Sequence, residues 1–159
     1  MNIATADLMD RADAGLQSCT TQFHQYGARR AFHGPVRTLR TREDNAQVRS
    51  LLSTPGLGAV LVVDGGGSLR TALLGDQLAA LGAANGWSGV ILHGAVRDVT
   101  ALARIELGIK ALGSNPRKSA KLATGAMDVP VTFGDTTFRP GDWVYSDDDG
   151  IVVSERKLH

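Results

Sequence analysis

Apolar residues along this chain fall into short continuous runs separated by stretches with helical spacing. The segment Ala59–Asp64 is apolar up to its final aspartate, which is typical of a strand covered on both faces. The amphipathic stretch Asp76–Asn85 predicts a helix, and the apolar run Ser88–His93 after it predicts another strand. Strands and helices that alternate through short turns indicate parallel strand pairing in this middle section.

The same pattern predicts further elements on either side. We expect a helix from Thr5 through Ala14 with Thr5 as its cap, a strand over Phe32–Thr41, a helix capped by Asp44 or Asn45 that runs to Ser53, a helix over Asp98–Leu107, and a strand near Ile109–Leu112. From Val129 onward, short strands separated by turns at Gly134-Asp135, Pro140-Gly141 and Asp149-Gly150 predict antiparallel hairpins. With no internal repeat or linker, residues 1–159 predict one mixed α/β domain.

Composition narrows the class of protein. The 17 basic and 16 acidic residues nearly balance, which argues against a nucleic-acid or membrane-surface partner. A single cysteine, Cys19, excludes an internal disulfide. No apolar run approaches the roughly 20 residues of a membrane-spanning helix, and the first residues do not resemble a signal peptide. We therefore expect a cytoplasmic protein.

Candidate chemistry gathers at two turns where an apolar strand leads into a helix. The first turn places Gly75, Asp76, Gln77 and Leu78 at a helix start, where unpaired backbone N–H groups suit a carboxylate or phosphate. The second turn carries Arg97 and Asp98. Arg97 is a candidate anion ligand and Asp98 a candidate metal ligand, so the two turns together predict a site for an anionic substrate.

Simpler interpretations of these residues remain open. Asp76 and Asp98 could be helix caps, and Arg97 could pair with a surface acid such as Glu106. The basic loop, which comprises residues 116–121 and carries Lys118 and Lys121, is more typical of a solvated or subunit-contact surface than of a phosphate site.

Other motifs carry weaker signals. Gly65-Gly66-Gly67 could suggest a nucleotide or methyltransferase site, but Arg70 stands where a dinucleotide fingerprint needs glycine, and tight backbone packing is favoured. Asp147-Asp148-Asp149-Gly150 lacks the spacing of a calcium loop and predicts a hairpin turn. The histidines have no ligand spacing; His93 could line the pocket or pack in the core.

The spacing of Asp76, twenty residues, and then Arg97-Asp98 resembles the signature of the class II pyruvate aldolases. These are the 4-hydroxy-4-methyl-2-oxoglutarate aldolases, which share a fold with the regulators of ribonuclease E activity. Similar segments occur in the same order over residues 7–154: V-V-D-G-G-G-S-L-R, G-D-Q-L, N-G-W-S-G, H-G-A-V-R-D-V, A-L-G-S-N-P-R-K-S and F-R-P-G-D-W-V-Y-S-D-D-D-G-I-V-V.

The resemblance implies a layered β/β/α swivelling-domain fold with a mixed sheet, a ring-like homotrimer, and an aldol cleavage that yields pyruvate. Such a cleavage needs a lysine Schiff base or a divalent metal to stabilise the enolate. The lysines lie in a strand start, the basic loop and the tail, so Mg²⁺ or Mn²⁺ held by Asp98 is the better candidate.

In the same resemblance, Arg97 stabilises the enolate and Asp76 orients a water that moves a proton. The amides of the first helix turn hold the carboxylate of a small 2-keto acid. Longer aldolases continue into C-terminal helices that supply an acidic group of a neighbouring subunit, whereas this sequence ends at His159. The competing function is a non-enzymatic regulator that binds and masks ribonuclease E or a helicase.

Overall fold

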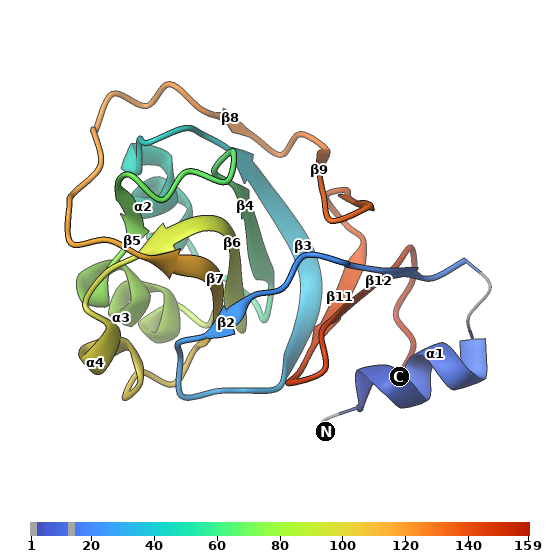
Figure 1. Cartoon of the computed structure of the whole chain (residues 1–159). Coiled ribbons are helices and arrows are strands. Elements are labelled where there is room, and N and C mark those ends of the chain that lie inside the picture. The colour runs from blue at the N-terminus through green and yellow to red at the C-terminus, as the bar shows by residue number, and fades with distance from the viewer. Residues whose placement is uncertain (1–2, 13–14) are drawn as a thin grey trace.

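The structure is a computed structural model that describes residues 3–12 and 15–159 (Figure 1). Its helices are α1 (Thr5–Ala12), α2 (Ala46–Leu52), α3 (Asp76–Ala84) and α4 (Val99–Leu102). Its strands are β1 (Gln17–Ser18), β2 (His24–Gln25), β3 (Phe32–Arg40), β4 (Val60–Asp64), β5 (Ala72–Leu74), β6 (Gly89–Val96), β7 (Gly108–Ser114), β8 (Ala126–Met127), β9 (Val131–Phe133), β10 (Thr136–Phe138), β11 (Trp143–Ser146) and β12 (Ile151–Ser154).

One mixed sheet runs through the molecule. Its order in the described residues is β1-β12-β11-β3-β4-β6-β7-β2, with β5 paired to β6 and β8 paired to β3. The strands β3, β4, β6 and β7 are parallel, as is the β5–β6 pair, and the outer pairings are antiparallel. The separate β9–β10 pair is an antiparallel hairpin. The fold is therefore the mixed α/β class expected from the sequence.

The long strand β3 joins two layers of the structure. Its first half, Phe32–Pro35, pairs antiparallel with β11, and its second half, Val36–Arg40, pairs parallel with β4. In Figure 1, β3 runs between the helix-covered strands and the β11–β12 strands. One strand thus belongs to both the parallel and the antiparallel part of the sheet.

Two hydrophobic cores lie on opposite faces of the parallel strands. On β4, Leu61 and Val63 pack in the core that includes residues of α2 and α3, while Val60 and Val62 pack in the core that includes residues of β9 to β12. Because successive side chains of a strand point to opposite faces, this alternation confirms a strand buried on both sides. The result is a β/β/α layering.

One predicted helix is much shorter than expected. The stretch Asp98–Leu107 contains only α4, Val99–Leu102, followed by turns. The carbonyls of Ile105 and Leu107 accept hydrogen bonds from the N–H groups of Ala28 (3.0 Å) and Arg29 (3.5 Å), so the segment after β2 takes over these acceptors. After Leu102 the chain continues in tighter turns, in which the N–H groups of Arg104 and Ile105 bond to carbonyls three residues earlier, and the bonds to Ala28 and Arg29 fix these turns against the segment after β2.

Other elements differ from the predicted boundaries by only a few residues. The predicted strand Ser88–His93 is β6, which continues to Val96, and the predicted strand Ile109–Leu112 is β7, which continues to Ser114. The hydroxyl and N–H of Thr5 both bond the Asp147 carboxylate, at 2.7 and 2.8 Å, so Thr5 anchors the start of α1. The predicted end of that helix at Ala14 lies outside the described residues. The predicted hairpin turns at Gly134-Asp135 and Asp149-Gly150 are confirmed, since they join the antiparallel pairs β9–β10 and β11–β12. The turn at Pro140-Gly141 is not a hairpin, because it leads from β10 to β11, which lie in different sheets.

Short strands are what the sequence pattern missed. The strands β1, β2, β5 and β8 have two or three residues each, too few to show alternation. The strand β5 matters most, because it leads directly into α3. No helix among the residues that the structure describes is long and apolar enough to cross a membrane.

Candidate active site

The two strand-to-helix turns lie side by side. The strand β5 pairs parallel with β6, with Ala72 opposite Ala95 and Leu74 opposite Val96. The N–H of Arg97 continues this pairing by donating to the carbonyl of Leu74 at 2.9 Å. Because parallel strands bring their carboxyl ends to one edge, the start of α3 and the Arg97-Asp98 pair meet there.

The side chain of Asp98 contacts the start of the neighbouring helix. Its Oδ2 accepts a hydrogen bond from the N–H of Asp76 at 3.0 Å. Asp98 is the N-cap residue of α4 but makes no side-chain capping bond there, and its backbone is left-handed (φ 60°, ψ 43°). Aspartate tolerates that conformation better than most residues. The simple capping interpretation is therefore wrong for Asp98, because its carboxylate caps α3 instead of its own helix.

Asp76 is the first residue of α3, and Gly75 is the N-cap. A Cβ atom at Gly75 would lie 2.7 Å from Asp98 Oδ2 and 3.3 Å from Arg97 Cγ, so only glycine leaves room for both side chains. The exposed Asp76 carboxylate makes no capping bond for its own helix. The Gly75-Asp76 order thus allows the two turns to approach closely.

Arg97 is half-buried beside the basic loop. Its Nη1 lies 3.5 Å from the carbonyl oxygen of Pro116. Among the ion pairs of the described residues, none joins Arg97 to Glu106. Most of the guanidinium donors therefore stay available to an anionic ligand.

These residues line one open cavity of about 440 Å³, within the usual range for small-molecule sites. It brings together every residue that the sequence singled out at the two turns. Four basic and two acidic side chains face it, so the cavity has a net positive charge. Its lining is Asn45, Arg49, Ala72, Gly75, Asp76, Gln77, Leu78, Arg97, Asp98, Lys118 and Lys121.

Sequence reasoning missed the contribution of Asn45 and Arg49 and treated the basic loop as surface. The loop instead supplies Lys118 and Lys121 to the cavity. Its density of positive charge was the available signal, but only the tertiary fold shows where the loop lies. The loop is held at its middle by Ser119, whose hydroxyl is buried and donates to the carbonyl of Ala72 at 2.7 Å.

Asp44 holds the residues that follow the basic loop. Its carboxylate is buried and accepts hydrogen bonds from the N–H groups of Ala46, Leu122 and Thr124 and from the Thr124 hydroxyl, at 2.8 to 3.2 Å. Burial alone would raise the pKa of Asp44, but these hydrogen bonds lower it to about 2. Of the two predicted caps, Asn45 holds the N-cap position of α2 but makes no side-chain capping bond, whereas the carboxylate of Asp44, one residue earlier, accepts the N–H of Ala46. The same carboxylate ties the start of α2 to the residues just after the basic loop.

The donor set at Asp98 fits a water-rich divalent ion. The part of the chain described here has no group of three or more His, Cys, Asp or Glu side chains that could enclose a metal. Mg²⁺ and Mn²⁺ accept one or two carboxylates when water and substrate oxygens complete the coordination. The Asp76 amide fixes Asp98 Oδ2, as hydrogen bonds around metal ligands commonly do, and Oδ1 is left as the second carboxylate oxygen for a metal.

The remaining sequence candidates have structural roles. A Cβ atom at Gly65 would lie 2.9 Å from the carbonyl oxygen of His93, which confirms close backbone packing at the glycine triplet. His93 lies inside β6, stacked on Phe133 with ring centroids 4.6 Å apart, so it does not end its strand. Lys110 is also inside its strand, β7, where burial lowers the pKa of its amine. The Lys110 amine donates to the carbonyls of Asp147 and Gly150, away from the cavity.

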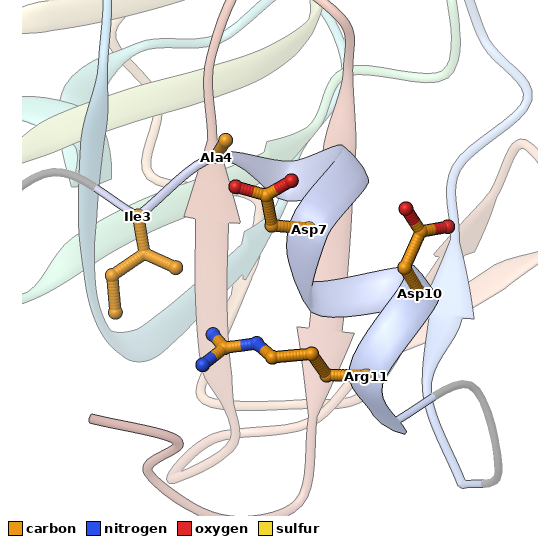
Figure 2. Close-up of a pocket in the computed structure, with 5 residues that line it drawn as sticks. All are labelled: Ile3, Ala4, Asp7, Asp10 and Arg11. Atoms are coloured by element: carbon orange, nitrogen blue, oxygen red, sulfur yellow. The ribbon is translucent and has the colours of Figure 1, made fainter.

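A second cavity, of about 390 Å³, lies beside α1. Figure 2 shows that its charged side chains, Asp7, Asp10 and Arg11, all project from this one helix. Unlike the cavity at Asp98, it does not bring together side chains from separate helices, strands and loops. The cavity at Asp98 is therefore the better candidate for an active site.

Comparison with known proteins agrees with this location. A family model described as RraA-like, Aldolase/RraA, matches residues 5–153. The chain belongs to the RraA-like family. The resemblance noted in the sequence is confirmed at the level of the family.

Several solved structures share the RraA-like fold. A Geobacillus kaustophilus HTA426 protein described as S-adenosylmethionine: 2-dimethylmenaquinone methyltransferase is 46% identical, with a TM-score of 0.97 over 98% of this chain and 97% of that one. The RNA-processing inhibitor RraA from Thermus thermophilis is 43% identical, with a TM-score of 0.96 over 100% and 96% of the two chains.

A more distant relative is Streptomyces coelicolor RraAS2, described as an unusual member of the RNase ES inhibitor RraA protein family. It is 32% identical, with a TM-score of 0.74 over 93% of this chain and 76% of that chain. Because the family includes both enzymes and inhibitors, any conclusion about function has to rest on the residues of the cavity.

Proposed function

We propose that this RraA-like chain is a cytoplasmic, divalent-metal-dependent lyase that cleaves 4-hydroxy-4-methyl-2-oxoglutarate and related 4-hydroxy-2-oxo acids to pyruvate. The observation that carries this proposal is the convergence of Asp98, Arg97 and the start of α3 on one positively charged cavity. A protein that acted only by masking another protein would have no need of a carboxylate fixed beside a guanidinium in a small-molecule cavity.

Binding of the 2-keto acid would use the first turn of α3. The N–H of Asp76 is already bonded to Asp98, so the amides of Gln77 and Leu78, with Gly75 beside them, are the donors for a substrate carboxylate. The first-turn amides also carry the positive end of the helix dipole. Arg97 would donate to the keto oxygen.

The bond cleavage follows from these positions. A divalent cation held by Asp98 would supply the Lewis acid that stabilises enolate charge on the keto oxygen. Asp76, exposed at the cavity wall, would orient a water that takes the proton of the 4-hydroxyl. As the C3–C4 bond breaks, its electrons move toward the C2 oxygen, where Arg97 donates hydrogen bonds to the growing charge. The C4–OH carbon becomes a ketone as its proton leaves, so the C4 fragment is released as one pyruvate. Protonation of C3 by water converts the enolate into the other.

Oxaloacetate decarboxylation is the expected side reaction, because loss of CO₂ leaves the same pyruvate enolate. It requires no removal of a hydroxyl proton, so it depends less on Asp76. This difference separates the role of Asp76 from the roles of Arg97 and Asp98.

Pyruvate release by the purified protein tests the proposal. We expect turnover of 4-hydroxy-4-methyl-2-oxoglutarate that disappears with a chelator and returns with Mg²⁺ or Mn²⁺. Absence of pyruvate release from this substrate and from oxaloacetate, with either ion present, would contradict the proposed activity.

We further propose that the protein is a homotrimer whose neighbouring subunit closes the site. The cavity is open, and two large apolar residues beside it in sequence, Val99 and Leu122, are 41% and 74% exposed. Exposed apolar side chains next to an open site favour a subunit contact. Closing the cavity would also exclude water and strengthen the contacts of Arg97.

The second candidate function is inhibition of ribonuclease E by direct binding, which the names of the Thermus and Streptomyces relatives support. Adding the purified chain to a ribonuclease E cleavage assay tests it. Inhibition that persists in the Asp98→Ala variant would show a regulatory function independent of the cavity chemistry.

A further inference from the structure

The segment that follows β12, residues 155–159, folds back onto the sheet, and we call it the latch segment. The N–H of Leu158 donates a hydrogen bond to the phenol oxygen of Tyr145 at 2.8 Å. The same oxygen lies 3.0 Å from Nδ1 of His159. Tyr145 belongs to β11 and is buried. One buried phenol thus holds two consecutive residues of the latch segment against the sheet.

Aromatic rings complete this contact. The ring of His159 meets the ring of His33 edge-to-face, with centroids 4.6 Å apart, and the ring of Trp143 with centroids 5.5 Å apart. His33 itself stacks on Tyr145, with centroids 5.7 Å apart. The ammonium of Lys157 lies 5.2 Å from the centre of the Trp143 ring. The latch segment therefore packs on His33 of β3 and on Trp143 and Tyr145 of β11, which we call the aromatic surface.

No acid balances a positive charge at this contact. Among the ion pairs of the described residues, none involves His33 or His159. Burial, and then the nearby charges of His159 and Lys157, lower the pKa of His33. Desolvation against the sheet, and then Lys157, lower the pKa of His159. Burial raises the pKa of the Tyr145 phenol, which therefore stays neutral. The contact thus favours neutral imidazole rings.

We propose that the latch segment is a pH-sensitive switch, seated on the aromatic surface while His33 and His159 are neutral and released from it when they are protonated. Protonation would bring two imidazolium rings and the Lys157 ammonium together with no acid beside them, and like charges at such short distances repel. Release would uncover Trp143 and Tyr145. The switch belongs to the β3–β11 pairing rather than to the cavity at Asp98, and it requires no lyase activity.

The direction of the pH dependence follows from the lowered pKa values. Both histidines have an ordinary pKa of 6.5 and a lower pKa in the seated form. The seated form is therefore fully favoured above pH 6.5 and is destabilised as the pH falls through the lower values.

The hydrogen bonds at Tyr145 have the same pH dependence. Its phenol oxygen already accepts the N–H of Leu158, so its own proton is available to an unprotonated Nδ1 of His159. A protonated His159 could no longer accept that proton. Protonation therefore weakens the hydrogen-bonded anchor as well as adding repulsion between the rings.

NMR relaxation of backbone amides tests the switch on the intact protein. At about pH 7.5, the amides of the latch segment should have the same heteronuclear NOE as the sheet, and at about pH 5 they should be mobile on the ps–ns timescale. The amides of β4 should remain rigid at both pH values, which distinguishes release from unfolding. Equal mobility of the latch segment at the two pH values would overturn the proposal, and so would simultaneous loosening of β4.

Substitution of His33 assigns the effect to charge. His33→Phe keeps an aromatic ring on the aromatic surface but cannot be protonated, so the midpoint of release should fall by at least about half a pH unit. Should this variant not fold, His33→Gln provides the same neutral side chain in a polar form. The matched control is His24→Phe, because His24 lies on β2 and its ring neighbours Tyr26. The control should keep the native midpoint, and a native midpoint in the His33 variant would overturn the switch.

Tyr145→Phe separates the hydrogen bonds from the charges. This variant keeps the buried ring of β11 but removes the oxygen that contacts Leu158 and His159. We therefore expect the latch segment to be mobile already at about pH 7.5, where the histidines are neutral. A latch segment as rigid as in the native protein would contradict the anchoring by Tyr145 on which the switch depends.

Discussion

Single residues at the cavity have separable roles, and Asp98 combines two of them. Its carboxylate is the proposed metal ligand and also the acceptor for the N–H of Asp76. Its left-handed backbone adds a third constraint, since alanine is less suited than aspartate or asparagine to φ 60°. A substitution at this position therefore has to distinguish charge from backbone conformation.

For Asp98→Asn, we expect loss of metal-dependent pyruvate release with little change in stability, because asparagine keeps an acceptor oxygen and tolerates the backbone. Asp98→Ala should lose the same activity and also about 1 kcal/mol of unfolding free energy, from the lost acceptor and the less favourable backbone. Pyruvate assays with thermal denaturation measure both effects. Native activity in Asp98→Asn would remove the metal-ligand role.

Asp76→Asn tests proton transfer. The Asp76 side chain makes no capping bond in α3, so the change should leave the helix intact. We expect aldol cleavage to fall at least tenfold more than oxaloacetate decarboxylation, since one general acid–base contribution is often worth 10² or more. Rates for the two substrates, measured on one preparation, give the comparison. Parallel losses in both reactions would point to a different role for Asp76.

Among the elements, the junction between β5 and α3 at Gly75 determines how closely this turn can approach the Arg97-Asp98 turn. Gly75→Ala would bring a Cβ to 2.7 Å from Asp98 Oδ2. We expect kcat/KM to fall at least tenfold because Asp98 and Arg97 must move. The control is Gly94→Ala in β6, where a Cβ would have its nearest neighbours at 3.6 Å, an ordinary contact. Equal activity of the two variants would show that the close approach is unimportant.

The connection between α2 and the basic loop should respond to acid. The pKa of Asp44 is about 2 in the folded protein against an ordinary 3.8, so its ionised form stabilises the fold by about 2 kcal/mol above pH 4. Because the folded pKa is the lower one, this stabilisation is lost as the pH falls from about 4 through 2. The difference in free energy of unfolding between the native protein and Asp44→Asn, measured by urea unfolding, should therefore decrease as the pH falls over that interval. A constant gap would contradict the assignment.

How much the sequence could reveal depended on element length. Runs such as Ala59–Asp64 predicted buried strands, because an apolar stretch of five or more residues between turn signals is long enough to recognise. The three-residue β5 gave no such signal, and the helical pattern after Asp98 gave no sign that the chain turns away from the helix after Leu102 and packs against residues 28 and 29. The Asp76, Arg97 and Asp98 cavity was foreseen from motif spacing. The contribution of Arg49, Lys118 and Lys121 was not, since it depends on contacts between distant segments.

For the whole molecule, the family resemblance predicts a homotrimer that persists in dilute solution, and the open cavity with the exposed Val99 and Leu122 favours a subunit contact there. Analytical ultracentrifugation at the concentration of the activity assay should give about three times the 16.8 kDa chain mass. Val99→Asp or Leu122→Asp should shift the protein toward monomer and lower its activity together, because a charge would be buried in the contact. A fully active monomer would contradict a site closed by a neighbouring subunit.

The dual pairing of β3 has a consequence for synthesis on the ribosome. The second half of β3 meets β4 early in the chain, but its first half needs β11, and β1 needs β12. Until residues 131–154 have been made, the nascent chain lacks the strands that cover one face of its parallel strands, including Val60, Val62 and Ile91. Such exposed apolar surface favours aggregation and chaperone binding. The layer formed by β9 to β12, which lies away from the active site, therefore determines how long the growing chain is prone to aggregation.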